Sequence, residues 1–142
     1  MKRVFRVIPV FLVVLFFSCG DGLTKKVMSS YENGAPARVH VYDKSGNCIK
    51  EIDYYETGEL MMEGEIRDNL RNGEWTSYFI DGKVQSSGFF KDGKRTGKAL
   101  VYHENGNLYM DGWYKDDHKC GQWVFYDEQG YELATANYGE CD

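Results

Sequence analysis

One short segment carries several of the residue types that bind metal ions. Asp116, Asp117, His118 and Cys120 fall within residues 116–120, and carboxylate, imidazole and thiolate groups are ligands for zinc. No second cluster of such residues stands near it in the sequence. The segment also aligns, at a spacing of 24, with residues 92–96, which have the composition of an ordinary turn. We therefore predict a solvated turn here and no metal site.

The remaining histidines and acids form no catalytic group. His40 and His103 are isolated, and Glu63 and Asp111 recur at equivalent repeat positions without a base beside them. The chain has no nucleophile elbow, P-loop or dinucleotide-binding fingerprint. We predict no catalytic residues, no cofactor and no enzymatic activity. A glycan hydrolase of the cell envelope is the weakest hypothesis, because no carboxylate pair stands out from the repeat.

The N-terminal residues have the features of an export signal. Lys2, Arg3 and Arg6 precede an apolar run over residues 7–17. This run is shorter than the roughly 20 residues of a membrane-spanning helix and suits a signal peptide. The segment Leu15-Phe16-Phe17-Ser18-Cys19-Gly20 then resembles a bacterial lipobox.

This resemblance implies a lipoprotein that is cleaved before Cys19 and acylated on the thiol and amine of that residue. We accordingly predict a signal peptide at 1–18, a lipidated cysteine with a tether at 19–30, and a membrane-anchored location in the bacterial cell envelope. The membrane would be the outer one if the cell has one. Several acyl chains, at about 0.8 kcal/mol per buried methylene, would make the anchoring durable. The alternative is an ordinary cleaved signal with an incidental cysteine.

Residues 31–142 are dominated by an internal repeat with a period of 24 residues. Self-similarity at a fixed period is the signature of a repeat architecture. The recurring residues are Tyr54, Tyr78, Tyr102 and Tyr126; Gly58, Gly82, Gly106 and Gly130; Gly64, Gly88 and Gly112; and Gly73, Gly97 and Gly121. Trp75 and Trp123 share a position at which the middle repeat has Ala99. We predict one β-repeat domain over residues 31–142.

Each repeat is expected to contain two strands and two turns. Residues 98–104 and 107–116 form the strands of one hairpin, and Asn105-Gly106 between them is typical of a two-residue type I′ turn. A longer turn over residues 117–121 leads to the next repeat. No segment after the export signal has a helical period. The predicted fold class is all-β: a repetitive antiparallel β-hairpin meander in a single-layer twisted sheet.

The predicted register brings each tryptophan opposite a small residue, so that an indole could cover glycine backbone on the neighbouring strand. We therefore assign Trp75, Trp123, Gly88 and Gly112 to the structural repeat. The pairs expected from a two-residue loop are Trp75 with Gly88, Phe79 with Val84, Ala99 with Gly112, His103 with Leu108, and Trp123 with Ala136.

The same alternation separates an apolar face from a face that carries tyrosines. Flat amphipathic rings suit interfaces, so the tyrosines could form an interaction surface; the alternative is cross-strand stacking that stabilises the sheet. The apolar face could be buried by strong twist, by residues 27–41 or by a partner. The tyrosines in question are Tyr78, Tyr102, Tyr109 and Tyr126.

Three further cysteines, Cys48, Cys120 and Cys141, remain for disulfide bonding. Cys48 and Cys120 are three repeats apart, which is roughly 29 Å at about 4.8 Å per strand. A disulfide needs Cα atoms within about 7 Å, so this pair is excluded. Cys141 falls within a strand or two of Cys120, and a bridge between them could hold the C-terminal edge. Free thiols are the alternative.

The charge of the chain argues against nucleic acid as a partner. Loss of the three basic residues of the export signal leaves 14 of the 17 Lys and Arg against 22 Asp and Glu, a net charge of −8. Such a domain repels phosphate backbones. Residues 31–42 and the acidic end at 140–142 could cap the two edges of the sheet, so we predict a monomer.

The recurring unit reads Gly-x-Trp-x-x-Tyr, a turn with glycine, and then Gly-x-aromatic-Lys-Asp-Gly. It appears over residues 73–78, with Gly82, Gly88 and residues 90–93, and again over residues 121–126. This pattern resembles the variant MORN repeat of the bacterial YwqK-type family, many of whose members are called antitoxins, over residues 42–138. The resemblance implies a protein-interaction, membrane-proximal or scaffold module. We expect a membrane-anchored lipoprotein with an unknown protein or envelope component as its partner; the alternative is an antitoxin or immunity protein.

Overall fold

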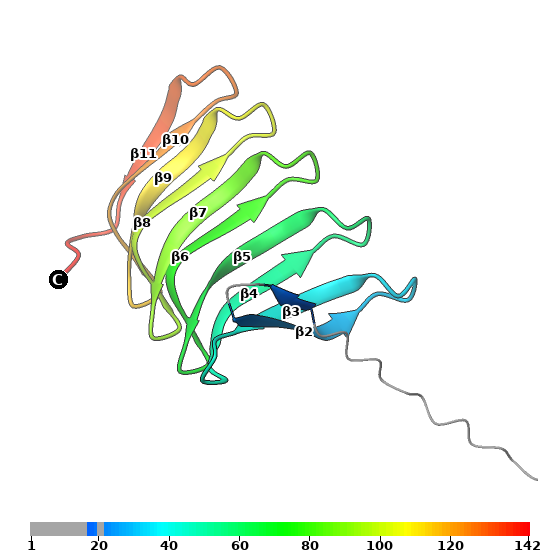
Figure 1. Cartoon of the computed structure of the whole chain (residues 1–142). Helices are drawn as coiled ribbons and strands as arrows, with labels where there is room; N and C mark the ends of the chain where they lie inside the picture. Colours follow the sequence, from blue (N-terminus) through cyan, green and yellow to red (C-terminus); the bar gives the residue numbers. More distant parts are fainter. Residues whose placement is uncertain (1–16, 20–21) are drawn as a thin grey trace, which may run out of the picture.

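The structure is a computed structural model that describes residues 17–19 and 22–142 (Figure 1). Residues 1–16 and 20–21, which include most of the predicted signal peptide, lie outside the described residues. The described residues form strands, turns and connecting segments without a helix. None of this described part is therefore a helix of the length and apolarity that crossing a bilayer requires.

In the described residues, eleven strands form one antiparallel sheet in which the order in space equals the order in the chain. Figure 1 shows the hairpin loops aligned in two rows along the two sides of this bent sheet. The hairpin meander predicted from the repeat is thus confirmed. The strands are β1 Phe17–Cys19, β2 Leu23–Ser30, β3 Pro36–Tyr42, β4 Cys48–Tyr54, β5 Leu60–Arg67, β6 Leu70–Tyr78, β7 Val84–Lys91, β8 Lys94–Tyr102, β9 Leu108–Lys115, β10 His118–Tyr126 and β11 Glu132–Asn137.

The sheet begins earlier than the repeat predicts. Most of the segment expected to be a tether is β2, which pairs with β3. The short β1 pairs with β2 in turn, so that Cys19 lies opposite Leu23. Residues 27–41 therefore extend the sheet at its edge rather than cover its apolar face. The glycine and tyrosine markers of the repeat are absent from β2, and this is why the period did not reveal it.

The tight turns and the longer loops occur at the opposite ends of the hairpins from those predicted. At Asn105-Gly106 the loop is a longer one, because His103 N donates to Asn107 O (2.8 Å) and Gly106 N donates to His103 O (2.9 Å). Gly106 alone has a positive φ there (91°), as in a type I turn followed by a bulge. The pairs predicted nearest the loops are therefore wrong: Val84 lies opposite Tyr78, and Leu108 opposite Tyr102.

The two-residue turn occurs instead at Asp116-Asp117. Both residues have a positive φ, 47° and 71°, as a type I′ turn requires. β10 begins directly afterwards at His118, so the longer turn expected over residues 117–121 is wrong. Aspartate and asparagine tolerate this left-handed conformation better than other non-glycine residues.

A bulge interrupts the strand that follows this tight turn. Cys120 lies opposite Trp113 and Val124 opposite Asp111, so β10 advances four residues where β9 advances two. Gly121 sits inside the interruption with φ 63°, a conformation that side chains rarely adopt. Bulges bend a strand and increase its twist, and they contribute to the curvature seen in Figure 1.

The C-terminal end of the chain is fastened to this bulge. Cys120 and Cys141 form a disulfide, Gly121 N donates to Gly139 O (2.6 Å), and Tyr138 N donates to Gly121 O (3.0 Å). The residues beyond β11 therefore fold back against β10.

The monomer remains a prediction, and these features at the C-terminal edge support it. A sheet edge that is held by the C-terminal residues of the same chain is less available to pair with another copy. We expect a single-chain mass by light scattering for the unlipidated protein at low micromolar concentration. A stable dimer under those conditions would contradict the prediction.

The thiol of Cys48 is free and half-buried. Its Sγ lies 3.8 Å from the carbonyl oxygen of Lys50. Burial raises the pKa of the Cys48 thiol above its ordinary value, and the nearby Glu51 carboxylate raises it further.

The raised pKa of Cys48 predicts slow alkylation near neutral pH. The thiolate is the reactive form, so a raised pKa lowers the reactive fraction at every pH below it. In a Cys19→Ser chain, iodoacetamide should modify Cys48 several-fold more slowly in the folded protein than in urea, and the difference should narrow at strongly alkaline pH. Mass spectrometry of the labelled peptide measures this, and equal rates at neutral pH would refute it.

Candidate functional site

The two tryptophans that recur in the repeat lie on one face of the sheet. Trp75 lies opposite both Gly64 and Gly88, and Trp123 lies opposite Ala136, so the register places the tryptophans where the sequence predicts. We call this side the indole face; its defining residues are Gly64, Trp75, Gly88, Ala99, Gly112 and Trp123.

Each indole covers the glycine of the preceding strand, not of the following one. A Cβ built on Gly64 would stand 2.2 Å from the ring of Trp75, and one built on Gly112 would stand 2.1 Å from the ring of Trp123. The expectation that Trp75 covers Gly88 is therefore corrected: the two are paired in register, but the ring points the other way.

Each indole N–H is satisfied by a backbone carbonyl. Trp75 Nε1 donates to Glu65 O (3.1 Å), and Trp123 Nε1 donates to Trp113 O (3.2 Å). In both cases the residue that follows the covered glycine provides an acceptor, and Trp123 Nε1 also donates to Cys120 O (3.2 Å). Trp123 is fully buried in this arrangement, with 0% of its surface exposed.

A cation recurs beside each of these aromatic positions. The guanidinium carbon of Arg71 lies 3.9 Å from the ring centroid of Trp75, and Lys119 Nζ lies 4.4 Å from that of Trp123. Arg95, at the equivalent position of the middle repeat, lies 4.4 Å from the ring of Tyr114. Such cation–π contacts contribute about 0.5–1 kcal/mol at exposed sites.

The middle repeat lacks the indole, and a hollow occupies its place. Ala99 stands where the other repeats have tryptophan, and a Cβ on Gly88 would find only the Ala99 Cβ, at 4.0 Å. Gly88 is partly exposed, whereas Gly64 and Gly112 are buried. The hollow has a volume of about 330 Å³, at the lower end of the range for ligand pockets. It extends across residues from β5 to β10.

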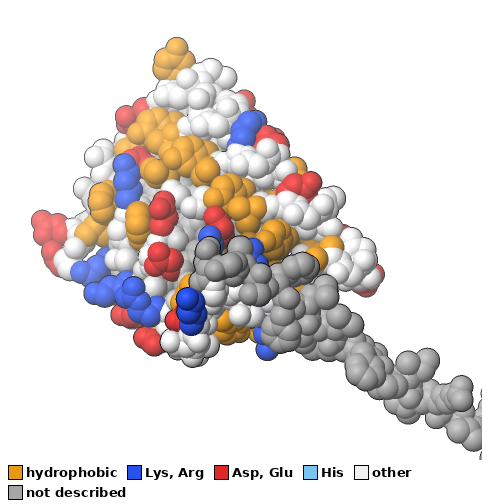
Figure 2. Space-filling model, in the orientation of Figure 1, with side chains coloured by type: hydrophobic (Ala, Val, Ile, Leu, Met, Phe, Trp, Pro, Cys, Tyr) orange, Lys and Arg blue, Asp and Glu red, His pale blue; other side chains and the backbone are white. Residues whose placement is uncertain are grey.

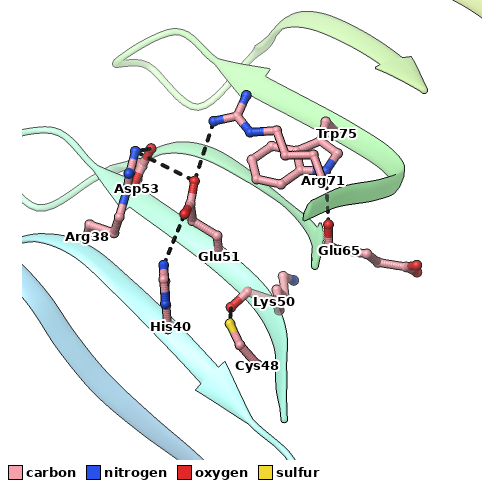
Figure 3. Close-up of polar contacts among 9 residues, drawn as sticks. All are labelled: Arg38, His40, Cys48, Lys50, Glu51, Asp53, Glu65, Arg71 and Trp75. Atoms are coloured by element: carbon pink, nitrogen blue, oxygen red, sulfur yellow. Dashed lines mark hydrogen bonds and ion pairs between the residues drawn. The ribbon is translucent and has the colours of Figure 1, made fainter. Parts of the chain in front are cut away.

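A cluster of buried charges lies at the N-terminal end of the indole face (Figure 3). Asp53 and Glu51 on β4 are 3% and 8% exposed. Both oxygens of Asp53 accept hydrogen bonds from Arg38, at 2.7 and 2.9 Å. Glu51 contacts His40 Nε2 at 3.0 Å and Arg71 Nη2 at 3.4 Å. Because Arg71 lies on β6, its contact with Glu51 joins β6 to the charges of β3 and β4, and Arg71 also stacks on Trp75.

The charge cluster is built to hold strands together. The hydrogen bonds to Asp53 raise the pKa of the Arg38 guanidinium; burial partly offsets this, and the Glu51 carboxylate adds to it. Sequence reasoning missed the cluster by treating His40 as isolated. The sequence does contain a signal for the cluster. Arg38 and His40 are two residues apart on one strand, and Glu51 and Asp53 are two residues apart on the next, so cross-strand pairing brings the two pairs together.

Residues 71–92 and 95–116 each match the family model described as MORN repeat variant. These two segments are variant MORN repeats. They contain the two cations Arg71 and Arg95, the uncovered Gly88, the covered Gly112, and Ala99 at the hollow. No curated protein matches the chain. MORN repeats are in general protein- or membrane-interaction modules.

The tyrosines predicted as an interaction surface have different neighbours, and their role in binding stays a prediction. Tyr78 in the first MORN repeat directs its hydroxyl at Glu63 Oε1 (3.5 Å), and its pKa is raised by burial and by that carboxylate. Tyr126 has its pKa raised by burial and by Asp111. Tyr102, in the second MORN repeat, lines a shallow hollow with Thr76 and Ser87.

Tyr109 stands apart from the other three. Its ring packs edge-on against His103 and Phe125, with centroids 5.0 and 6.3 Å away. His103 in turn contacts the carbonyl oxygen of Tyr126 (3.0 Å). Two tyrosine hydroxyls make the equivalent contact in earlier hairpins: Tyr31 donates to Tyr54 O and Tyr55 donates to Tyr78 O, both at 2.7 Å. These aromatic side chains therefore connect neighbouring hairpins along the row of loops.

Within the segment that holds the metal-ligand residue types, only Asp116 and Asp117 form a turn, and His118 and Cys120 already belong to β10. Asp117 pairs with Arg95, with 3.2 Å between Oδ1 and Nε, and His118 Nδ1 lies 2.9 Å from Asp116 O. Cys120 is engaged in the disulfide. Within residues 22–142 no three His, Cys, Asp or Glu side chains are grouped so as to hold a metal ion.

Proposed function

We propose that this protein is a membrane-anchored, non-enzymatic interaction module, tethered through acylated Cys19, which binds a protein or another component of the bacterial envelope through its sheet. The observation that carries the proposal is the open sheet itself. Across the described strands, each one packs beside its neighbours in a single layer, and large apolar side chains remain exposed.

Large apolar side chains are exposed on the described part of the chain. Figure 2 shows hydrophobic side chains gathered in a band across the face in view. Contiguous apolar patches on soluble domains usually mark interaction sites. The exposed large apolar residues are Met28, Leu70, Ile80, Val84, Phe89, Tyr109, Trp113, Tyr131, Leu133 and Tyr138.

The charge cluster supports the non-enzymatic part of the proposal. Catalytic carboxylates act on a substrate that can reach them. Asp53 and Glu51 are instead buried and engaged by Arg38, His40 and Arg71.

The position of the first strands indicates which edge of the sheet the proposed tether would hold. Only residues 20–22 separate Cys19 from β2. A chain acylated at Cys19 would therefore hold the edge of the sheet close to the lipid surface. The indole hollow, centred on β7 and β8, would stand roughly 29 Å further out at about 4.8 Å per strand.

The test is intact mass and membrane fractionation of the full chain expressed in a bacterium, wild type beside Cys19→Ser. We expect a wild-type mass that begins at Cys19 and includes acyl chains, membrane association, and loss of the acylated species in the variant. Envelope extract passed over the tethered protein should then yield a specific partner. An unprocessed, soluble wild-type protein would overturn the tether and make the alternative, an intracellular antitoxin, the leading hypothesis.

A further inference from the structure

The middle repeat offers a vacant position for an indole ring. In the flanking repeats a glycine is covered by a tryptophan: Gly64 by Trp75 and Gly112 by Trp123. Gly88 has the same place in its repeat, yet the residue that should cover it is Ala99. The hollow of about 330 Å³ lies there.

The walls of the hollow present groups that suit a flat aromatic ring. In the filled repeats, Trp75 meets Phe90 edge-on at 5.9 Å and Trp123 meets Tyr138 at 6.2 Å. Tyr114 has the equivalent position for a ring over Gly88, and it also meets Trp123 edge-on from the other side of the repeat, at 5.1 Å. The residues that line the hollow include Met62, Phe90, Val101, Met110, Tyr114 and Trp123.

The cation of the middle repeat has one aromatic ring where the others have two. Arg71 lies over Trp75 and Phe90, and Lys119 over Trp123 and Tyr138. The described contacts of Arg95 are to one ring, that of Tyr114. A ring placed over Gly88 would supply the second, and cation–π attraction favours that placement.

The repeat also predicts which carbonyl would accept a hydrogen bond from an indole N–H. The tryptophans of the flanking repeats donate to Glu65 O and Trp113 O. The carbonyl at the equivalent position is that of Phe89, a residue that lines the hollow. This acceptor distinguishes an indole from a phenyl ring, which has no donor.

We propose that the hollow over Gly88 binds the indole of a tryptophan carried by a partner polypeptide. The proposal rests on the proposed interaction function and names the partner's anchor residue. The filled repeats show that this position accommodates an indole borne on a polypeptide backbone, and tryptophan is enriched among the residues that dominate binding energy at interfaces.

The test uses the full chain in non-ionic detergent with its methionine methyl groups labelled for NMR. Met62 and Met110 line the hollow, whereas Met28 and Met61 serve as internal references. The probe is the capped tripeptide Ala-Trp-Ala, compared with its 1-methyltryptophan and leucine analogues and with free indole. We expect the tryptophan peptide to shift the signals of Met62 and Met110 selectively, the methylated peptide to bind more weakly, and the leucine peptide not to bind.

Two variants close the site in different ways. Gly88→Ala has room in the empty hollow, but its Cβ would collide with a bound ring as a Cβ at Gly64 or Gly112 would. Ala99→Trp fills the hollow from the protein's own chain. Both should keep a folded spectrum and weaken the tryptophan peptide about tenfold or more, whereas Ser45→Ala, in an exposed turn between β3 and β4, should bind as the wild type does.

Several results would overturn the proposal. These are equal binding of tryptophan and leucine peptides, unchanged binding by Gly88→Ala, or binding of free indole without binding of the peptide. If Gly88→Ala still captures its partner from envelope extract, the interaction module stands and this anchor site falls. If the wild type captures no partner while the tryptophan peptide binds, the proposed function fails and the indole site stands.

Discussion

Gly112→Ala is expected to lower the free energy of unfolding by about 1–3 kcal/mol, the range for overpacking a filled core. The added Cβ would lie 2.1 Å from the ring of Trp123, and this ring is fully buried, so it cannot yield without disturbing its neighbours. Backbone strain plays no part, because the φ of Gly112 is not in the left-handed region.

Gly88→Ala is the matched control, at the same position one repeat earlier. Its Cβ would meet only Ala99, at 4.0 Å. Replacing glycine by alanine where the backbone permits it stabilises by about 0.4–1 kcal/mol through the unfolded chain. We therefore expect Gly88→Ala to be neutral or slightly stabilising. Urea denaturation of both variants measures the difference, and equal losses of stability would show that the rings do not cover the glycines as described.

Cys141→Ser is expected to cost about 3 kcal/mol, the loop-closure contribution of a disulfide that spans some 20 residues. The bond joins Cys120 to Cys141 with a sequence separation of 21. Its loss would also loosen the backbone bonds between Gly121 and the chain at Tyr138 and Gly139. The change should therefore be local as well as global.

Urea denaturation with and without reductant, together with amide exchange at Gly121, checks this prediction. Reductant should destabilise the wild type and leave Cys141→Ser unchanged. Cys48→Ser is the control, because Cys48 is a free thiol, and it should still respond to reductant. A wild-type midpoint that does not respond to reductant would refute the contribution of the bridge.

The period of 24 was sufficient to predict the architecture. Rare residues at fixed spacing, such as Trp75 and Trp123, mark equivalent places in successive hairpins. The register was predicted from an assumed two-residue loop. It is confirmed away from the loops, as the pairing of Trp75 with Gly88 shows, because a register shift between Ser77 and Tyr78 offsets the greater length of the loop. The hairpin architecture depends on alternation and period, and both can be read from a single sequence.

Three features depended on properties that the period does not contain. Which turn is tight was decided by paired aspartates at Asp116-Asp117, which adopt positive φ without glycine. The direction in which each indole lies depends on its rotamer, because Trp75 has glycine on both sides. The charge cluster lies where the repeat is degenerate, so no periodic comparison could reveal Glu51 and Asp53.

The agreement between chain order and strand order also determines how the molecule would respond to tension. A force applied along the chain from its N-terminal end would load β2 across its ladder with β3, so that hydrogen bonds open one after another and not together. Since each hairpin is stabilised mainly by its neighbours, yielding would proceed hairpin by hairpin from that end. The disulfide between Cys120 and Cys141 would protect the C-terminal end, and extension would stop there.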